Sequence, residues 1–205
     1  MSENQEPDET NKKISEDNSK QRITADITYH EYFMAIACLS AKRSKDQKRK
    51  VGACIVNEKN RIVSTGYNGF VDSIKNNDET FDWSDNKKNL YVCHAEMNAV
   101  ANRHCTDLKD CTIYVTLFLC NECTKLLLQS GIKRVIYYAD DKLKAEEDNQ
   151  KKADEGKYMA SKEMLDKSGV ELVQYKDLED EDGSPLNPKR NIILSFDEIA
   201  LQKQT

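Results

Sequence analysis

The sequence predicts an α/β fold with three layers, in which helices cover both faces of one mixed sheet of about five strands. Two short β-branched runs, one on each side of residue 59, indicate a strand hairpin near the start of the domain. Strand and helix patterns then alternate along the rest of the chain, as they do in α/β folds. The length of 205 residues favours one domain with room for tails, and we find no internal repeat.

The N-terminal part divides into a tail and a first helix. Residues 1–25 hold too few large aliphatic side chains to offset the entropy of ordering them, so we expect a disordered polar tail. Residues 26–205 are expected to form the single domain. Thr28 and Glu31 have the spacing of a capping box, which predicts a helix that ends near Ser44.

The β-branched runs predict two strands, over residues 51–57 and 61–65, joined by a turn at residues 59–60. Residues 66–69 (GYNG) are expected to close this hairpin. The polar stretch that follows, to about Leu90, is predicted to be a long loop. Loops of that length inside a domain are often functional.

Helical and strand patterns alternate over the second half of the chain. The predicted helices cover residues 94–104, 121–130 and 158–167. The predicted strands cover residues 111–117, 133–138, 171–175 and 191–196. The charged segment 140–157 is predicted to be helical at least in its later part, an acidic insertion lies near residues 177–190, and Asp197 has the chemistry to cap a terminal helix.

The composition narrows the function classes. The mean hydropathy is −0.78 and no stretch approaches the ~18 apolar residues of a membrane-spanning helix, so we expect no contact with a membrane. A net charge of −5 and a pI near 5.4 speak against a protein that binds duplex nucleic acid. The chain has 7 cysteines and begins without the apolar stretch of a secretory signal, which favours reduced thiols in a cytoplasmic protein.

Two short motifs carry the chemistry. His94 and Glu96 lie in the first (CHAE), and Cys120 and Cys123 lie in the second (CNEC), each at the start of a predicted helix. One imidazole and two thiolates are three ligands for a tetrahedral zinc ion, which keeps its fourth position for water. The positive ends of both helices favour the anionic ligands. Glu96 has the reach to approach the water without binding the metal. The motifs therefore predict a catalytic zinc site.

A closed structural zinc site is the main alternative. Cys93, Cys105 or Cys111 would then supply the fourth ligand, and Glu96 would have no necessary role. Cys38 and Cys54 lie in apolar runs and are expected to be small core residues.

The resemblance to a known family is specific and extends well beyond these motifs. The segments EYFMAIACLSAKRSKD, VGACIVN, GYNG, YVCHAEMNAV and TLFLCNECTKLLLQSGIKRVIYY closely resemble the deoxycytidylate (dCMP) deaminases of the zinc-dependent cytidine and deoxycytidylate deaminase superfamily. The match runs from about Tyr29 to Asp140 and more weakly from Gly169 to Ile199. The resemblance implies a cytidine-deaminase-like three-layer α/β/α domain. One departure is Leu119, which stands where the superfamily signature has a proline.

The resemblance also implies the activity and the residues that perform it. The expected reaction is the zinc-dependent hydrolysis of dCMP to dUMP and ammonia, which supplies the precursor of thymidylate. His94, Cys120 and Cys123 would hold zinc. Glu96 would take a proton from the activated water, and it would protonate ring N3 and the leaving ammonia. The expected substrate contacts are the Asn68 side chain to the sugar, backbone groups at Ala53, Ala95 and Leu119 to the base, and Ser44 and Lys45 to the phosphate.

Regulation and assembly are implied by the resemblance as well. The family is cytosolic, forms hexamers in many members, and commonly responds to dCTP as an activator and to dTTP as an inhibitor. In this chain the loop after GYNG is rewritten from Phe70 to Asp78, so we expect weak or absent activation by dCTP. Two other functions stay open, namely deamination of another cytosine nucleotide and a non-catalytic or weakly active zinc-stabilised subunit.

Overall fold

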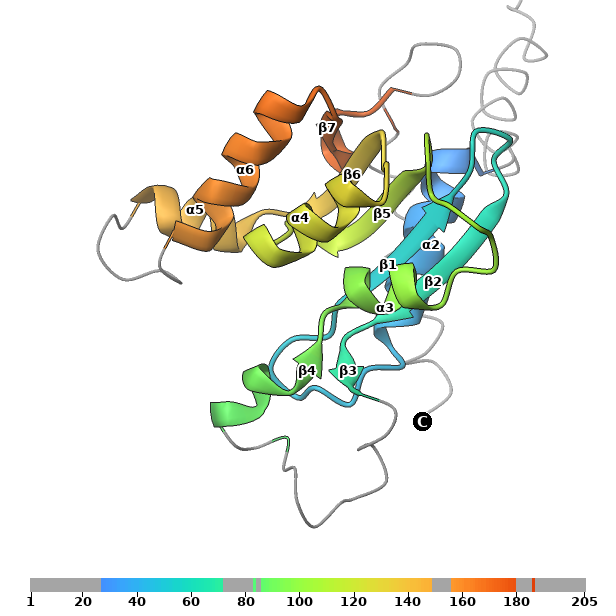
Figure 1. Cartoon of the computed structure of the whole chain (residues 1–205). Helices are drawn as coiled ribbons and strands as arrows, with labels where there is room; N and C mark the ends of the chain where they lie inside the picture. Colours follow the sequence, from blue (N-terminus) through green and yellow to red (C-terminus); the bar gives the residue numbers. More distant parts are fainter. Residues whose placement is uncertain (1–26, 72–82, 84–85, 149–155, 180–185, 187–205) are drawn as a thin grey trace, which may run out of the picture.

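A mixed sheet of five strands forms the centre of the molecule (Figure 1). The computed structural model describes residues 27–71, 83, 86–148, 156–179 and 186. Strands β1 and β2 are antiparallel, as are β1 and β5, whereas β5, β6 and β7 run parallel to one another. In spatial order the strands are β2 (Ile62–Tyr67), β1 (Gly52–Val56), β5 (Thr112–Leu117), β6 (Arg134–Ala139) and β7 (Glu171–Gln174).

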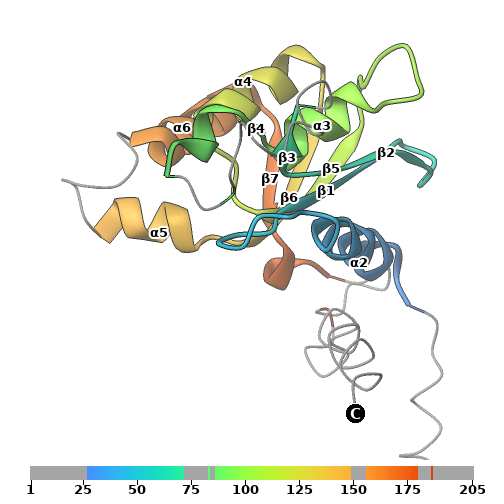
Figure 2. The same ribbon diagram turned by 90° about the horizontal axis from the view of Figure 1, so that it is seen from below.

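Helices cover both faces of this sheet, as Figure 2 shows. Helix α2 lies on one face, and α3, α4 and α6 lie on the other. Their bounds, with those of α5 and the two 3₁₀ helices, are α2 Tyr29–Ala41, η4 Asn86–Leu90, α3 Ala95–Ala101, α4 Asn121–Gln129, α5 Asp141–Asp148, α6 Lys157–Ser168 and η6 Tyr175–Asp177. The predicted three-layer α/β/α fold and its mixed sheet of about five strands are confirmed.

The side chains of β1 divide the core into two parts, because successive residues of a strand point to opposite faces of the sheet. Ala53 and Ile55 belong to the larger cluster, which α3, α4 and α6 cover. Cys54 and Val56 belong to the cluster beneath α2. All five residues of β1 are buried, so this strand joins the two helical layers.

Two glycines bring helices unusually close to the hairpin, one on each face. A Cβ atom on Gly52 would lie 2.0 Å from the Ala37 carbonyl oxygen in α2. A Cβ atom on Gly66 would lie 2.2 Å from the Ala95 carbonyl oxygen and 2.3 Å from the Ala99 nitrogen in α3. Backbone therefore packs directly on backbone at both points, which only glycine permits.

Several boundaries differ from the sequence-based expectations. The first helix has the predicted capping box, in which Thr28 accepts from the Glu31 N–H and Glu31 accepts from the Thr28 N–H, but it ends at Ala41. Helix α3 is also shorter than predicted and ends at Ala101. The charged segment forms a helix in its earlier part, α5, and most of the later part, where the sequence predicts a helix, lies outside the described residues.

The GYNG segment does not form the expected turn. Gly66 and Tyr67 continue β2, because they pair with Ala53 and Gly52 of β1. Gly69 begins β3 (Gly69–Phe70), which pairs with β4 (Val92–Cys93) in a small second sheet that the sequence patterns do not predict.

Other expectations fall outside the described residues. These are the polar tail 1–25, the strand 191–196, the helix capped by Asp197 and most of the acidic insertion. Over the part of the chain that the structure describes, no helix has both the length and the apolar character needed to cross a bilayer.

Candidate metal centre

Two helices begin on the predicted metal ligands. His94 is the N-cap of α3 and Cys120 is the N-cap of α4, and both have extended backbone angles. Strand β4 leads into α3 and strand β5 leads into α4, so the sheets deliver both helix N-termini to one place. Neither N-cap side chain is used to cap its own helix, which leaves the imidazole and the thiol available to a ligand.

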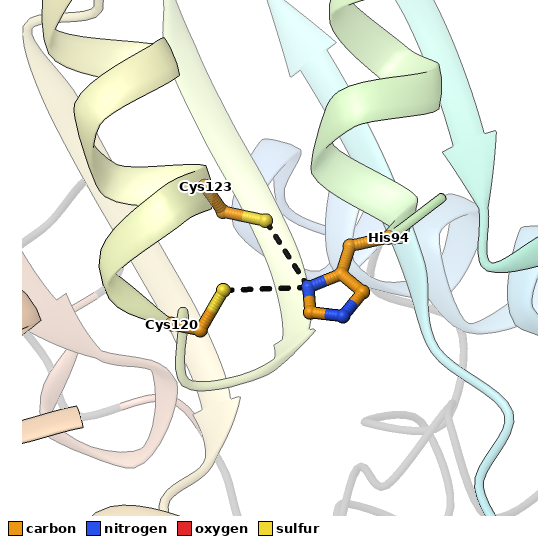
Figure 3. A group of neighbouring side chains, drawn as sticks. All are labelled: His94, Cys120 and Cys123. Atoms are coloured by element: carbon orange, nitrogen blue, oxygen red, sulfur yellow. Dashed lines mark hydrogen bonds between the residues drawn. The ribbon is translucent and has the colours of Figure 1, made fainter. Parts of the chain in front are cut away.

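The three predicted ligands converge on one point. The His94 Nδ1 atom lies 3.4 Å from the Cys120 Sγ atom and 3.3 Å from the Cys123 Sγ atom (Figure 3). Ideal Zn–N and Zn–S bonds at a tetrahedral angle would separate a nitrogen and a sulfur by about 3.6 Å. The donor types and their spacing therefore fit a zinc ion, and a small adjustment of the side chains would admit it.

Hydrogen bonds among His94, Cys120 and Cys123 shift the pKa values of all three groups strongly. Hydrogen bonds from Cys123 and His94 lower the pKa of Cys120 to about 4, even though burial opposes the shift. The hydrogen bond to Cys120 raises the pKa of His94 to about 9. The hydrogen bond to Cys120, together with burial, raises the pKa of Cys123. The arrangement thus favours a thiolate at Cys120, with the other two groups holding protons that a cation would displace.

The cluster has three protein ligands and not four. Among the described residues it is the one group of three or more His, Cys, Asp and Glu side chains whose ligand atoms all lie within 4.8 Å of one another. Cys93, Cys105 and Cys111 are not members of it. Cys105 is exposed and donates to the Asp107 carbonyl oxygen, and Cys111 lies in the core. The geometry therefore disfavours the closed structural site.

Glu96 lies beside the cluster and is almost fully buried. Its carboxyl group forms a hydrogen bond with Cys123 and interacts electrostatically with His94. Burial raises the pKa of Glu96, although the positive His94 opposes the shift. A buried carboxyl group with a raised pKa beside an open metal position is suited to taking up and releasing a proton.

The residues predicted to contact the base lie together. Ala53, Ala95 and Leu119 are all fully buried members of the cluster that also holds Cys120 and Cys123. Ala95 follows His94 and Leu119 precedes Cys120, so two of the three adjoin a metal ligand in the chain. All three positions therefore lie in the core that packs behind the ligand cluster, and their role in base binding stays a prediction.

Asn68 lies just before the small second sheet and is held by the loop before β1. It directly precedes Gly69, which pairs with Cys93, the residue before His94. The Asn68 Oδ1 atom accepts from the Val51 N–H at 2.8 Å. Its Nδ2 atom donates to the Arg49 carbonyl oxygen at 3.0 Å and to the Asp46 Oδ2 atom at 3.3 Å.

The two predicted phosphate contacts differ in exposure. Ser44 is buried and its hydroxyl accepts from the Asp46 N–H at 3.2 Å, whereas Lys45 is exposed. In the same basic loop, Arg49 forms a two-pronged ion pair with Asp141 of α5, with nitrogen–oxygen distances of 2.6 and 3.1 Å. No described contact joins Ser44 or Lys45 to the metal centre.

Sequence reasoning missed a buried polar network beside this site. Asp46 and Lys88 form an ion pair in which both side chains are more than nine-tenths buried. Burial would raise the pKa of Asp46, but hydrogen bonds from Lys88 and from the N–H groups of Lys48 and Arg49 outweigh it, and the pKa lies below its usual value. The sequence does not predict the burial of Lys88, because the residue lies in a stretch whose composition is typical of a polar loop.

Comparison with known proteins supports one family. The family model described as the cytidine and deoxycytidylate deaminase zinc-binding region matches residues 27–139. This range contains both motifs, the five residues predicted to contact base or sugar or to transfer protons, and the two phosphate candidates.

Individual relatives extend this similarity. A deoxycytidylate deaminase of Pongo abelii is 45% identical over 155 residues, which are 73% of this chain and 80% of that protein. The deoxycytidylate deaminase of Homo sapiens is 52% identical over 120 residues, covering 56% of this chain and 66% of the human protein. The fold is similar to the crystal structure of the dCMP deaminase of cyanophage S-TIM5 in complex with dCMP and dUMP, with a TM-score of 0.54, 24% identity, and coverage of 70% of this chain and 94% of that chain.

Proposed function

The chain belongs to the family of zinc-binding cytidine and deoxycytidylate deaminases, and from this membership we propose that it hydrolyses dCMP to dUMP and ammonia. The observation that carries the proposal is the open cluster of three ligands with a buried glutamate beside it. The two relatives described above are called deoxycytidylate deaminases, and deoxycytidylate is dCMP.

His94, Cys120 and Cys123 would hold the zinc ion through the Nδ1 atom and the two Sγ atoms. A zinc ion held there supplies a Lewis acid that activates water for attack on the cytosine ring. The fold holds the N-termini of α3 and α4 close together so that the three ligands can meet. The positive ends of these helices would stabilise the thiolate ligands.

Glu96 would be the residue that moves protons. Its carboxylate would take one proton from the attacking water and deliver it to ring N3. It would then carry the remaining proton of the added hydroxyl to the amino group, which leaves as ammonia. The raised pKa of Glu96 supports both steps, because a group that titrates nearer to neutral pH serves as base and as acid in one cycle.

The remaining residues would position the nucleotide. Backbone groups at Ala53, Ala95 and Leu119 would contact the base, and two of these residues adjoin a predicted metal ligand in the chain, Ala95 after His94 and Leu119 before Cys120. Both donors of Asn68 have protein partners. Among the described residues the Val51 N–H is the donor to Oδ1, so the second lone pair of Oδ1 would accept from a sugar hydroxyl.

Ser44 and Lys45 would contact the phosphate, which makes the basic loop before β1 the phosphate end of the site. Lys45 is exposed, so its ammonium group has the freedom to meet a phosphate that arrives from solvent.

Assembly and control belong to the same proposal. The five-stranded sheet and its covering helices share one packed core on each face, which supports the proposal that residues 26–205 form a single deaminase domain. We expect a homo-oligomer, a hexamer by family resemblance, and weak or absent activation by dCTP, because the family's loop after GYNG is rewritten in this chain.

Parallel rate measurements on dCMP, CMP, dCTP and deoxycytidine, with zinc-loaded protein and with and without dCTP as effector, test the proposal. A 5′-phosphate adds charge-assisted hydrogen bonds, so we expect kcat/KM for dCMP to exceed that for deoxycytidine by about 100-fold, or about 3 kcal/mol. Equal rates on these two would indicate a nucleoside deaminase, preference for CMP or dCTP would indicate another nucleotide, and no turnover would indicate a non-catalytic subunit.

A further inference from the structure

The orientation of the Asn68 side chain is fixed by its neighbours. An amide offers two N–H donors on one side and one oxygen with two lone pairs on the other. Both donors of Asn68 are used, by Asp46 and by the Arg49 carbonyl oxygen, and the oxygen faces the Val51 N–H. Asp46 is the one charged group among these partners, and an ionised carboxylate accepts hydrogen bonds but cannot donate them. The amino group of Asn68 therefore has to face Asp46.

Asp46 itself is held from four directions. Its Oδ1 atom accepts from the Lys48 N–H at 2.8 Å, from the Arg49 N–H at 3.2 Å and from the Lys88 ammonium group. Its Oδ2 atom accepts from Asn68. The carboxylate thus ties the basic loop before β1 to Asn68 and to η4, the 3₁₀ helix that precedes β4.

Lys88 is placed to neutralise this carboxylate away from water. It is only 4% exposed, and its ammonium group lies 5.6 Å from the centre of the Trp83 ring. Trp83 packs on Phe70 of β3, with 4.3 Å between ring centroids. A buried ion pair often adds little to stability relative to apolar side chains. We therefore look for the role of the Asp46–Lys88 pair in the orientation of the Asn68 side chain.

The location of Asn68 suggests a function for the fixed orientation of its side chain. Asn68 directly precedes Gly69, and Gly69 pairs with Cys93, the residue before His94, so the chain brings Asn68 to the same end of the small sheet as His94. Among the described residues the Val51 N–H is the donor to Asn68 Oδ1, which leaves its second lone pair for a ligand. Rotation of the amide by half a turn would bring its amino group to the Val51 N–H, donor against donor, and would remove the acceptor from its place.

We infer that Asp46, neutralised by Lys88, is a positioning residue that holds the Asn68 oxygen as an acceptor for the 3′-hydroxyl of the substrate's deoxyribose. The inference rests on the proposed function for the identity of the substrate. It makes the Asp46–Lys88 pair a determinant of sugar recognition, although neither side chain touches the nucleotide.

A comparison of dCMP with 2′,3′-dideoxycytidine 5′-monophosphate, which lacks only the 3′-hydroxyl, tests this. In the full-length zinc-loaded protein we expect dCMP to be preferred by about tenfold in kcat/KM, the worth of one good hydrogen bond. The double variant Asp46→Asn/Lys88→Met removes both charges at nearly constant volume, which avoids a lone buried charge. In this variant we expect the preference to fall to about twofold through a higher KM for dCMP, with the dideoxy substrate nearly unaffected.

The matched control is Asp141→Asn, the same chemical change at the exposed carboxylate that pairs with Arg49. We expect it to keep the wild-type preference, because Asp141 contacts the arginine side chain and not the Asn68 network. A folded double variant that keeps the full preference for dCMP would overturn the inference.

A second measurement needs neither turnover nor a variant. In ¹⁵N-labelled wild-type protein, the side-chain amide protons of Asn68 should exchange with water at least about tenfold more slowly than those of Asn60, which lies in an exposed turn. Equal exchange rates would overturn the inference even if the double variant failed to fold. A wild-type protein that does not deaminate dCMP would instead overturn the proposed function, while the exchange rates would still decide whether Asn68 is held.

Discussion

Helices α3 and α4 begin in the same way but are held by different contacts. Each starts on a predicted metal ligand, His94 in α3 and Cys120 in α4, and each carries a glutamate two residues later. Glu96 of α3 is only 4% exposed and faces the metal ligands. The Glu122 side chain of α4 is 57% exposed and pairs with Lys125. Two equivalent positions therefore have opposite surroundings.

The cause lies in how each helix meets the rest of the fold. Helix α3 packs backbone to backbone on β2 at Gly66, and the Ser64 hydroxyl donates to the Ala99 carbonyl oxygen at 2.6 Å. The Asn98 amide donates to the Tyr67 carbonyl oxygen at 2.7 Å. These short contacts leave no room for a shift of the helix.

Helix α4 is held by side chains on both sides. Its Leu127 packs in the main core with Val135 of β6 and Leu165 of α6. The buried hydroxyls of Thr124 and Ser161 join α4 to α6 at 2.6 Å. Contacts between side chains adapt more readily than contacts between backbones, so we expect the half of the site on α3 to be the less tolerant of substitution.

Loss of the metal is the largest expected effect and tests what the two helices share. Purified protein should carry about one zinc ion per chain, and Cys120→Ser or Cys123→Ser should lose it together with all activity, because a hydroxyl replaces a thiolate ligand. Metal analysis by mass spectrometry measures this. Cys105→Ser is the control, and we expect it to retain zinc because Cys105 lies outside the cluster. Full zinc loading of both ligand variants would contradict the assignment.

The two glutamates test the comparison most directly. Glu96→Gln should keep zinc and the fold but lower kcat by about 10³-fold or more, because both proton transfers use this carboxyl group. The same substitution in α4, Glu122→Gln, should change kcat by less than about twofold, since an exposed ion pair contributes little. Steady-state rates with dCMP give both values. Similar losses in the two variants would show that the difference in burial has no catalytic meaning.

The packing of α3 is tested at its closest point. Gly66→Ala should reduce the free energy of unfolding by about 3 kcal/mol, because the new methyl group would overlap the backbone of α3. The displaced helix should also bind zinc more weakly through His94. Gly69→Ala serves as the control, since its Cβ atom would lie 3.7 Å from the nearest neighbour, an ordinary contact. Chemical denaturation compares the two, and equal stabilities would refute the close approach.

The smallest expected effect concerns α4. Thr124→Val leaves the Ser161 hydroxyl buried without a partner and should cost about 1–2 kcal/mol in the free energy of unfolding. The double variant Thr124→Val/Ser161→Ala should recover most of this, because both polar groups are then gone. Zinc content and kcat should stay near their wild-type values in both. A loss of zinc as large as that of Gly66→Ala would show that α4 is held no less strictly than α3.

Local chemistry made much of this predictable from sequence. The capping box of Thr28 and Glu31 predicted α2. The residue patterns predicted the five strands of the main sheet, with errors at the ends of the strands. The motifs around His94 and Cys120 predicted two helices that begin at candidate zinc ligands. The prediction was possible because imidazole and thiolate groups at this spacing are typical of zinc sites. The Gly66–Gly69 segment misled, since turn propensity there yields to pairing with β1.

Long-range contacts decided the rest. Sequence alone determined the donor set, the glutamate beside it and the order of strands and helices, because each depends on residues close together in the chain. Only the tertiary structure decided that Glu96 is buried and Glu122 is not, that Asp46 meets Lys88 across 42 positions, and that Asn68 donates to Asp46. These facts depend on how strands and helices pack across the sheet, and packing between distant segments has no local signature.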